Sequence, residues 1–164
     1  MESSILTKVA KDLKNKKITV VREFDAAPDL VWRAWTESEL LDQWWAPRPW
    51  VTETKSLKFE EGGNWLYAMR GPDGNKIWNI VEFKSIKRHQ SFQAESSFCD
   101  DKGNKNPEFP SMLWKNVFIA SGTGTKVEVE ISFTKETDLQ KIVDMGFEAG
   151  FTSALANLDE LLAK

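Results

Sequence analysis

The chain has 164 residues, which is the size of one domain with a self-sufficient apolar core, and its net charge of −3 comes from interspersed acidic and basic residues. This pattern excludes a concentrated basic surface for nucleic acid, and no apolar run approaches the about 18 residues that a membrane span needs. A single cysteine, Cys99, excludes an intrachain disulfide, and no cluster of cysteine and histidine suits zinc. We therefore expect a cytoplasmic protein that needs no metal or cofactor and binds neither nucleic acid nor a membrane.

The N-terminal segment has its own hydrophobic pattern. Over residues 3–15, four apolar residues recur at helical spacing: Ile5, Leu6, Val9 and Leu13. This spacing predicts a short amphipathic helix, so we expect residues 1–16 to form an arm beside a main domain of residues 17–164. The arm is either a docked end of the domain, which we favour, or a partner-binding element.

The main domain is expected to begin with a strand and two short helices. Residues 17–24 are rich in β-branched side chains, which favours a strand. Pro28 suits the first turn of a helix, because its missing N–H would have no partner there. Thr36 and Glu39 have the spacing of a capping box, which predicts the start of a second short helix.

Six further strands are predicted between residues 51 and 133, and short turns join most of them. The turn at residues 72–75 contains Pro and Gly at positions that favour chain reversal. Consecutive strands joined in this way imply an antiparallel meander. The predicted strands are 51–59, 64–70, 76–86, 91–98, 112–120 and 126–133.

A long helix is expected at the C-terminus. Thr137 and Gln140 form a second capping-box pattern, which predicts the helix start. An apolar stripe follows: Val143, Phe147, Phe151, Ala154, Leu158 and Leu161. One stripe can cover the apolar face of a sheet, so the sequence predicts an α+β fold. In it, a curved antiparallel sheet of about seven strands wraps the helix, with two short helices between the first and second strands.

Four segments together resemble one known family: REFDAAPDLVWRAWTESELLDQWWAP (22–47), EEGGNWLYAMRGPDG (60–74), SGTGTKVEVEISF (121–133) and EAGFTSALANLDELL (148–162). Over residues 17–163 the chain resembles the activator-of-heat-shock-protein-90-ATPase homologue-like branch of the START-like (pollen-allergen-like, SRPBCC) superfamily. The resemblance implies a helix-grip fold with a cavity between sheet and helix, often holding an apolar or aromatic molecule. Where the family usually has Gly-Trp, this chain has Gly150 and Phe151, which removes an indole N–H.

The resemblance does not imply one activity, since members bind lipids, polyketides or hormones, cyclise polyketides, or assist a chaperone. Catalytic candidates in the sequence are few. His89, the single histidine, lies in a polar link between strands and is expected to be a solvated turn residue. Acidic neighbours should raise the pKa of the Cys99 thiol. Glu82 alternates with Val81 and Phe83, so we place it on the wet face. We assign no catalytic residue.

Eight tryptophans against one tyrosine is the unusual feature of the composition. These aromatics either pack a core or line a cavity, and the resemblance favours a cavity. Trp114 is the weakest assignment, because Leu113, Val117 and Ile119 form a rival apolar set in its strand. The predicted lining is Trp65, Tyr67, Met69, Val81, Phe83, Met112, Trp114, Phe118, Phe147 and Phe151.

The function that follows is a small-molecule binding protein, monomeric or homodimeric, which holds an apolar or aromatic ligand in the cavity. Two alternatives stay open. One is a protein-interaction or chaperone-accessory module, whose support is the resemblance. The other is a cyclase- or hydrolase-like enzyme, which needs a polar group inside the cavity, and Tyr67 is the best candidate.

Overall fold

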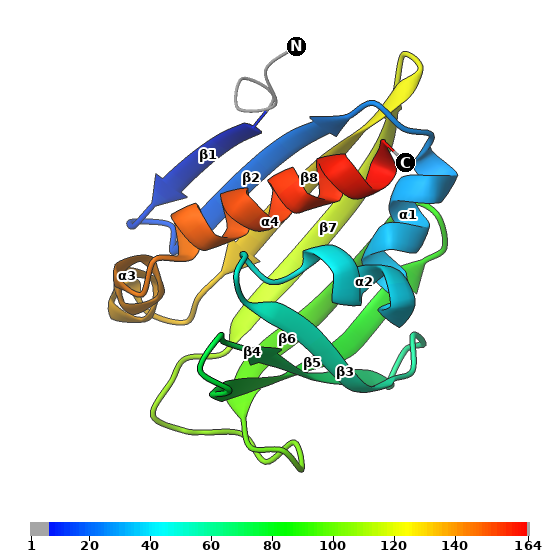
Figure 1. Cartoon of the computed structure of the whole chain (residues 1–164). Helices are drawn as coiled ribbons and strands as arrows, with labels where there is room; N and C mark the ends of the chain where they lie inside the picture. Colours follow the sequence, from blue (N-terminus) through cyan, green and yellow to red (C-terminus); the bar gives the residue numbers. More distant parts are fainter. Residues whose placement is uncertain (1–6, 164) are drawn as a thin grey trace.

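The computed structural model describes residues 7–163, which form eight strands and four helices in an α+β helix-grip fold. The strands make one antiparallel sheet in the order β1-β2-β8-β7-β6-β5-β4-β3, and it curves around α4 (Figure 1). In chain order the elements are β1 (Thr7–Asp12), β2 (Lys17–Phe24), α1 (Pro28–Thr36), α2 (Ser38–Trp44), β3 (Val51–Leu57), β4 (Asn64–Arg70), β5 (Lys76–Lys87), β6 (Ser91–Cys99), β7 (Met112–Ser121), β8 (Gly124–Ser132), α3 (Glu136–Asp144) and α4 (Phe147–Leu162).

The sheet follows the predicted alternation most clearly in β8. Val127, Val129 and Ile131 are buried on the concave face, whereas the charged residues between them lie toward solvent. Neighbouring strands continue this division, because antiparallel partners in register present their side chains on the same face. Ile131, for example, is the register partner of Trp114 in β7 and of Ile18 in β2. The concave face is therefore mainly apolar from β2 to β5, and Arg22, Asn79 and Asn116 are among its buried polar residues.

The predicted amphipathic helix over residues 3–15 is wrong where the structure describes it. Residues 7–12 form β1, which pairs with β2 from Thr7 opposite Arg22 to Asp12 opposite Lys17. Without β1, the outer edge of β2 would leave a row of N–H and C=O groups unpaired. Pairing them outweighs a weak helical periodicity. Residues 1–6 of the predicted arm lie outside the described residues.

Two predicted helix caps are also wrong. Thr36 is the last residue of α1, and its hydroxyl donates to the carbonyl of Trp32 (2.9 Å) instead of capping α2. The N-cap of α2 is Glu37. Thr137 lies inside the first turn of α3, whose N-cap is Lys135. The helix α3 therefore begins at Glu136, one residue before the predicted cap.

The C-terminal helix is two helices rather than one. Met145 and Gly146 separate α3 from α4, and Gly146 has a φ of 93°, a left-handed conformation that glycine adopts without a steric penalty. As a result, α4 alone lies across the concave face, with α3 at one end of it and α1 and α2 at the other (Figure 1).

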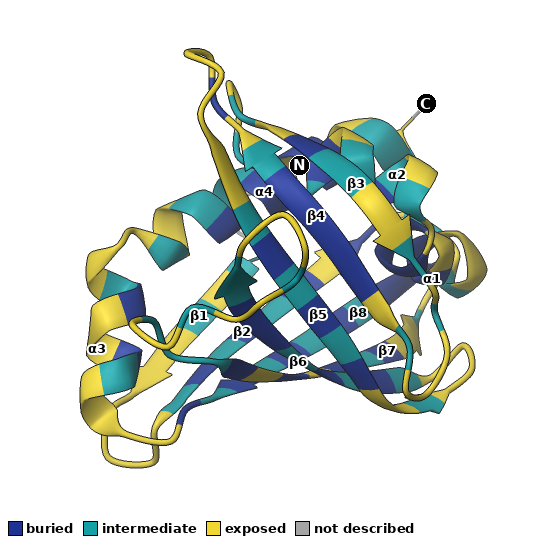
Figure 2. Ribbon diagram, turned by 90° about the horizontal axis from the view of Figure 1, so that it is seen from below, coloured by how far each residue is buried: buried dark blue, intermediate teal, exposed yellow. Residues whose placement is uncertain are grey.

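The outer face of the sheet is covered near β4 and β5. The loop of residues 100–110 folds back here, with Gly103 against Ile80 and Lys105 paired with Glu82 (2.5 Å). Leu66, the register partner of Ile80, is buried although it points away from the concave face. The middle of β4 is therefore buried on both sides (Figure 2).

Candidate functional site

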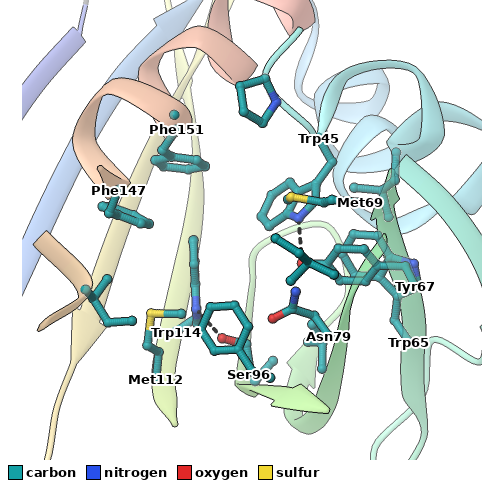
Figure 3. Close-up of a pocket in the computed structure, with 18 of the residues that line it drawn as sticks. Trp45, Trp65, Tyr67, Met69, Asn79, Ser96, Met112, Trp114, Phe147 and Phe151 are labelled. Carbon is teal, nitrogen blue, oxygen red and sulfur yellow. Dashed lines mark hydrogen bonds between the residues drawn. The ribbon is translucent and has the colours of Figure 1, made fainter. Parts of the chain in front are cut away.

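A cavity of about 370 Å³ lies between the concave face of the sheet and the helices (Figure 3). Cross-strand rows of side chains form its floor. One row runs from Tyr67 through Asn79 to Phe98, across β4, β5 and β6. The next row contains Trp65, Val81, Ser96 and Met112, and the one after it contains Phe83, Ala94 and Trp114. The sheet register therefore places most of the predicted aromatic set in one space.

Nine of the ten predicted lining residues surround this cavity. Phe147 and Phe151 approach from α4, opposite the sheet (Figure 3). The nine are Trp65, Tyr67, Met69, Val81, Phe83, Met112, Trp114, Phe147 and Phe151.

Phe118 is the exception. It is buried one layer behind the cavity wall and packs its ring against Trp32, Trp35 and Phe92. Its strand nevertheless follows the expected alternation. Met112 and Trp114 face inward, and the rival residues Leu113 and Ile119 are 44% and 37% exposed.

The helices α1 and α2 and the turn after α2 supply lining residues that we did not predict, and Trp45, at the C-cap of α2, is central among them. Its ring contacts those of Trp65 (5.5 Å between centroids), Trp114 (5.8 Å) and Phe151 (5.9 Å). Trp45 thus links the sheet wall to the helix wall. Its place could not be read from sequence, because it depends on how the chain turns after α2.

Three tryptophan N–H groups around the cavity have partners. Trp45 Nε1 donates to the Tyr67 hydroxyl and Trp114 Nε1 donates to the Ser96 hydroxyl, both at 2.9 Å. Trp65 Nε1 donates to Thr54 Oγ1, also at 2.9 Å, and its ring stacks on Tyr67. These bonds orient the indoles, so the cavity wall is a fixed aromatic surface.

Tyr67 is the polar group that the sequence placed in the cavity. Burial raises the pKa of its phenol well above the ordinary value, and the bond from Trp45 only partly opposes that effect. The phenol therefore keeps its proton at neutral pH and can donate it in a hydrogen bond.

Two buried asparagines were missed. Asn79 and Asn116 line the cavity and are 7% and 3% exposed. The signal for Asn79 was present, because it alternates in phase with Val81 and Phe83, which we placed inside. Polarity led us to pass over it, although the same alternation correctly placed Glu82 outside.

The other titratable candidates lie away from the cavity. His89 occupies a turn with a φ of 67°, stacks on Trp32 and has its Nδ1 3.0 Å from an oxygen of Asp29. Burial, together with the charge of Asp100, raises the pKa of Cys99 to about 11. None of these side chains lines the cavity, and neither does Glu82.

Clusters of metal-ligating side chains and membrane-spanning helices are two further features that would indicate a function. Residues 7–163 contain no group of three or more His, Cys, Asp or Glu side chains placed to hold a metal ion. None of the helices in that part of the chain combines the length and the apolar character needed to cross a bilayer.

A curved antiparallel sheet around a C-terminal helix, with an aromatic cavity between them, defines a helix-grip protein with an internal binding space. The family model described as Activator of Hsp90 ATPase homolog 1-like protein matches residues 25–163, and the chain belongs to this family. This confirms the branch that the sequence motifs indicated. No curated protein matches the chain.

Solved structures with the same fold come from several bacteria. Protein Ms6760 from Mycobacterium smegmatis is 28% identical, with a TM-score of 0.88 over 95% of this chain and 96% of that one. A protein from Arthrobacter aurescens, solved by NMR, is also 28% identical, with a TM-score of 0.91 over 96% of this chain and 92% of that one. The AHSA1 protein from Silicibacter pomeroyi is 21% identical and shares the fold, with a TM-score of 0.71 over 90% and 97% of the two chains.

Proposed function

We propose that this chain is a binding protein for a small apolar or aromatic molecule, held in the cavity between the sheet and α4. The observation that carries the proposal is the size and lining of that cavity, about 370 Å³ walled mainly by aromatic and aliphatic side chains. An apolar cavity of roughly 150 Å³ is already large enough to bind benzene. Ligand sites span roughly 300–1,000 Å³, so this one suits a drug-sized molecule.

The alternatives have weaker support. An enzyme would need an activated group at the cavity, yet the Tyr67 phenol stays protonated, and no described lining residue is Asp, Glu, Lys, Arg, His or Cys. The chaperone-accessory alternative rests on the family name. A cytoplasmic setting and a monomeric or homodimeric state accompany the proposal as predictions.

The experiment introduces a larger side chain on the sheet side of the cavity, so that it fills the space proposed for the ligand. Ala94 is buried, lines the cavity and lies between Phe83 and Trp114 in its cross-strand row. Ala94→Phe should occupy the ligand space, whereas Ala120→Phe adds the same ring at an exposed position of β7. N-phenyl-1-naphthylamine, whose fluorescence rises in apolar sites, should bind the parent and Ala120→Phe equally.

We expect Ala94→Phe to weaken binding of this probe at least tenfold while circular dichroism shows an unchanged fold. Equal binding by a folded Ala94→Phe would contradict the proposed site. Absence of probe binding in all three proteins would contradict the proposed function.

A further inference from the structure

The amide of Asn79 is a buried polar group that the fold itself does not use. No hydrogen bond joins its side chain to any residue of the described part of the chain, and the residue lines the cavity and is 7% exposed. Figure 3 shows the amide directed into the cavity. Buried polar groups in native proteins nearly always have partners, so an amide kept here indicates a partner that enters from outside the chain.

Tyr67 lies beside Asn79 because the two residues are register partners on β4 and β5. The Tyr67 oxygen accepts the N–H of Trp45 (2.9 Å), which fixes the hydroxyl and leaves its own proton available. Asn79 adds one acceptor oxygen and two donor hydrogens. Donors and an acceptor thus converge at one place on a mainly apolar wall.

The second missed asparagine does not offer a comparable contact. The amide oxygen of Asn116 also has no partner within residues 7–163, but neighbouring atoms cover it, so Asn116 offers the cavity a donor nitrogen and no accessible acceptor. The adjacent donor and acceptor therefore belong to Asn79, and the Tyr67 hydroxyl lies beside them.

The charge of the ligand is restricted as well. No described residue that lines the cavity carries a charge, and the walls are largely indole and phenyl rings. An ionised ligand would lose its hydration without gaining a counter-ion, which is strongly unfavourable. A flat, neutral molecule would instead stack on the rings of Trp45, Trp65 and Phe151.

We propose that the cavity selects an uncharged aromatic molecule with a hydrogen-bond acceptor next to a donor, as in a lactam or amide edge, and that Asn79 and Tyr67 bind this edge together. The ligand carbonyl accepts from the Tyr67 hydroxyl or the Asn79 amide nitrogen, and the ligand N–H donates to the Asn79 amide oxygen. This inference rests on the proposed function and names the ligand class.

Three probes with the same three-ring shape separate the effects of the lactam edge and of charge on binding. Phenanthridinone carries a lactam edge, phenanthrene has the same three rings without it, and phenanthrene-9-carboxylate carries a charge. Their dissociation constants are measured by quenching of tryptophan fluorescence for the parent, Asn79→Leu and Tyr67→Phe. The matched control is Asn64→Leu, which changes an exposed asparagine on the other face of β4.

We expect Asn79→Leu to weaken phenanthridinone about tenfold, the value of one lost hydrogen bond at a buried site, and to leave phenanthrene unchanged or tighter. Tyr67→Phe should weaken the lactam severalfold, Asn64→Leu should change neither probe, and the carboxylate should not bind. Since the two probes are compared across variants, their different hydrophobicities cancel.

If phenanthrene binds while both variants hold phenanthridinone as tightly as the parent, the inference is overturned and the proposed function stands. Binding of the carboxylate as tight as that of phenanthrene overturns the requirement for a neutral ligand. Failure of the parent to bind any probe contradicts the proposed function itself. If Asn79→Leu does not fold, as judged by circular dichroism, Tyr67→Phe alone decides the outcome.

Discussion

Tyr67 is the single tyrosine of the chain, so its ionisation can be followed without a signal from other tyrosines. Burial raises the pKa of this phenol, whereas a tyrosine in an unfolded chain ionises near pH 10. We expect the folded protein to show no tyrosinate absorbance through about pH 10.5, and the urea-unfolded protein to show it. A native titration midpoint near pH 10 would contradict the burial of Tyr67.

The same pKa shift has a consequence for stability. Above about pH 10 the unfolded chain loses the phenolic proton while the folded chain keeps it, so the unfolded state binds fewer protons. Stability from this group is therefore present below pH 10 and falls as pH rises further. Tyr67→Phe should lose less stability than the parent between about pH 9.5 and 11, as measured by urea denaturation. Identical pH profiles would contradict a raised pKa of Tyr67 in the folded protein.

At the residue scale, alternation along strands carried most of what could be predicted. It placed Trp65, Tyr67 and Met69 toward the helix and Glu82 away from it. Phe118 shows its limit, because alternation gives the face of a residue and not its depth behind other rings. Trp45 shows a second limit, since its position depends on tertiary packing.

At the element scale, the break between α3 and α4 depends on one glycine. Gly146 has a φ of 93°, and a methyl group added to it would point into open space, so Gly146→Ala should cost about 1 kcal/mol through backbone strain alone. Gly150 lies inside α4, where an added methyl group would meet Pro47 at an ordinary 3.8 Å. Gly150→Ala should therefore be neutral or stabilising, by up to about 1 kcal/mol.

Thermal and urea denaturation of these two variants provide the measurement. Only Gly146→Ala is expected to lose stability, and a Gly146→Ala variant as stable as the parent would argue for a continuous helix. The sequence predicted the apolar stripe of this region but not its interruption. A glycine after an exposed methionine is compatible with either a helix interior or a helix end, and only the geometry distinguishes the two.

β1 illustrates why an edge element was misassigned. Four apolar residues at helical spacing are a weak signal, whereas the unpaired edge of β2 is a strong requirement that local periodicity does not contain. Sheet order and the number of strands are decided by such long-range pairing. The meander from β3 to β8 was predictable because short turns and alternating side chains make it local.

At the scale of the whole molecule, the cavity divides the aromatic residues into two environments. Trp44 is 1% exposed and packs on Trp35 and Trp45, with its N–H bonded to the carbonyl of Ala34. Trp65 borders the cavity. Trp44→Ala should cost about 3–5 kcal/mol, and Trp65→Ala about 1–2 kcal/mol less, because part of its surface already lacks packed neighbours.

Urea denaturation of both variants checks this difference. Equal and large losses of stability would mean that Trp65 belongs to a close-packed core. Sequence alone could not decide between core and cavity, because composition gives the volume of the aromatic side chains and not the space left between the sheet and α4.

The most direct measurement of the central claim compares what the parent and the cavity-filled Ala94→Phe variant retain. Each protein is incubated with a mixture of small apolar metabolites, freed of unbound molecules and analysed by native mass spectrometry. We expect the parent to carry one bound neutral molecule per chain and Ala94→Phe to carry none. Retention of the same molecules by both proteins, or of none by the parent, would contradict the claim that this cavity is a ligand-binding site.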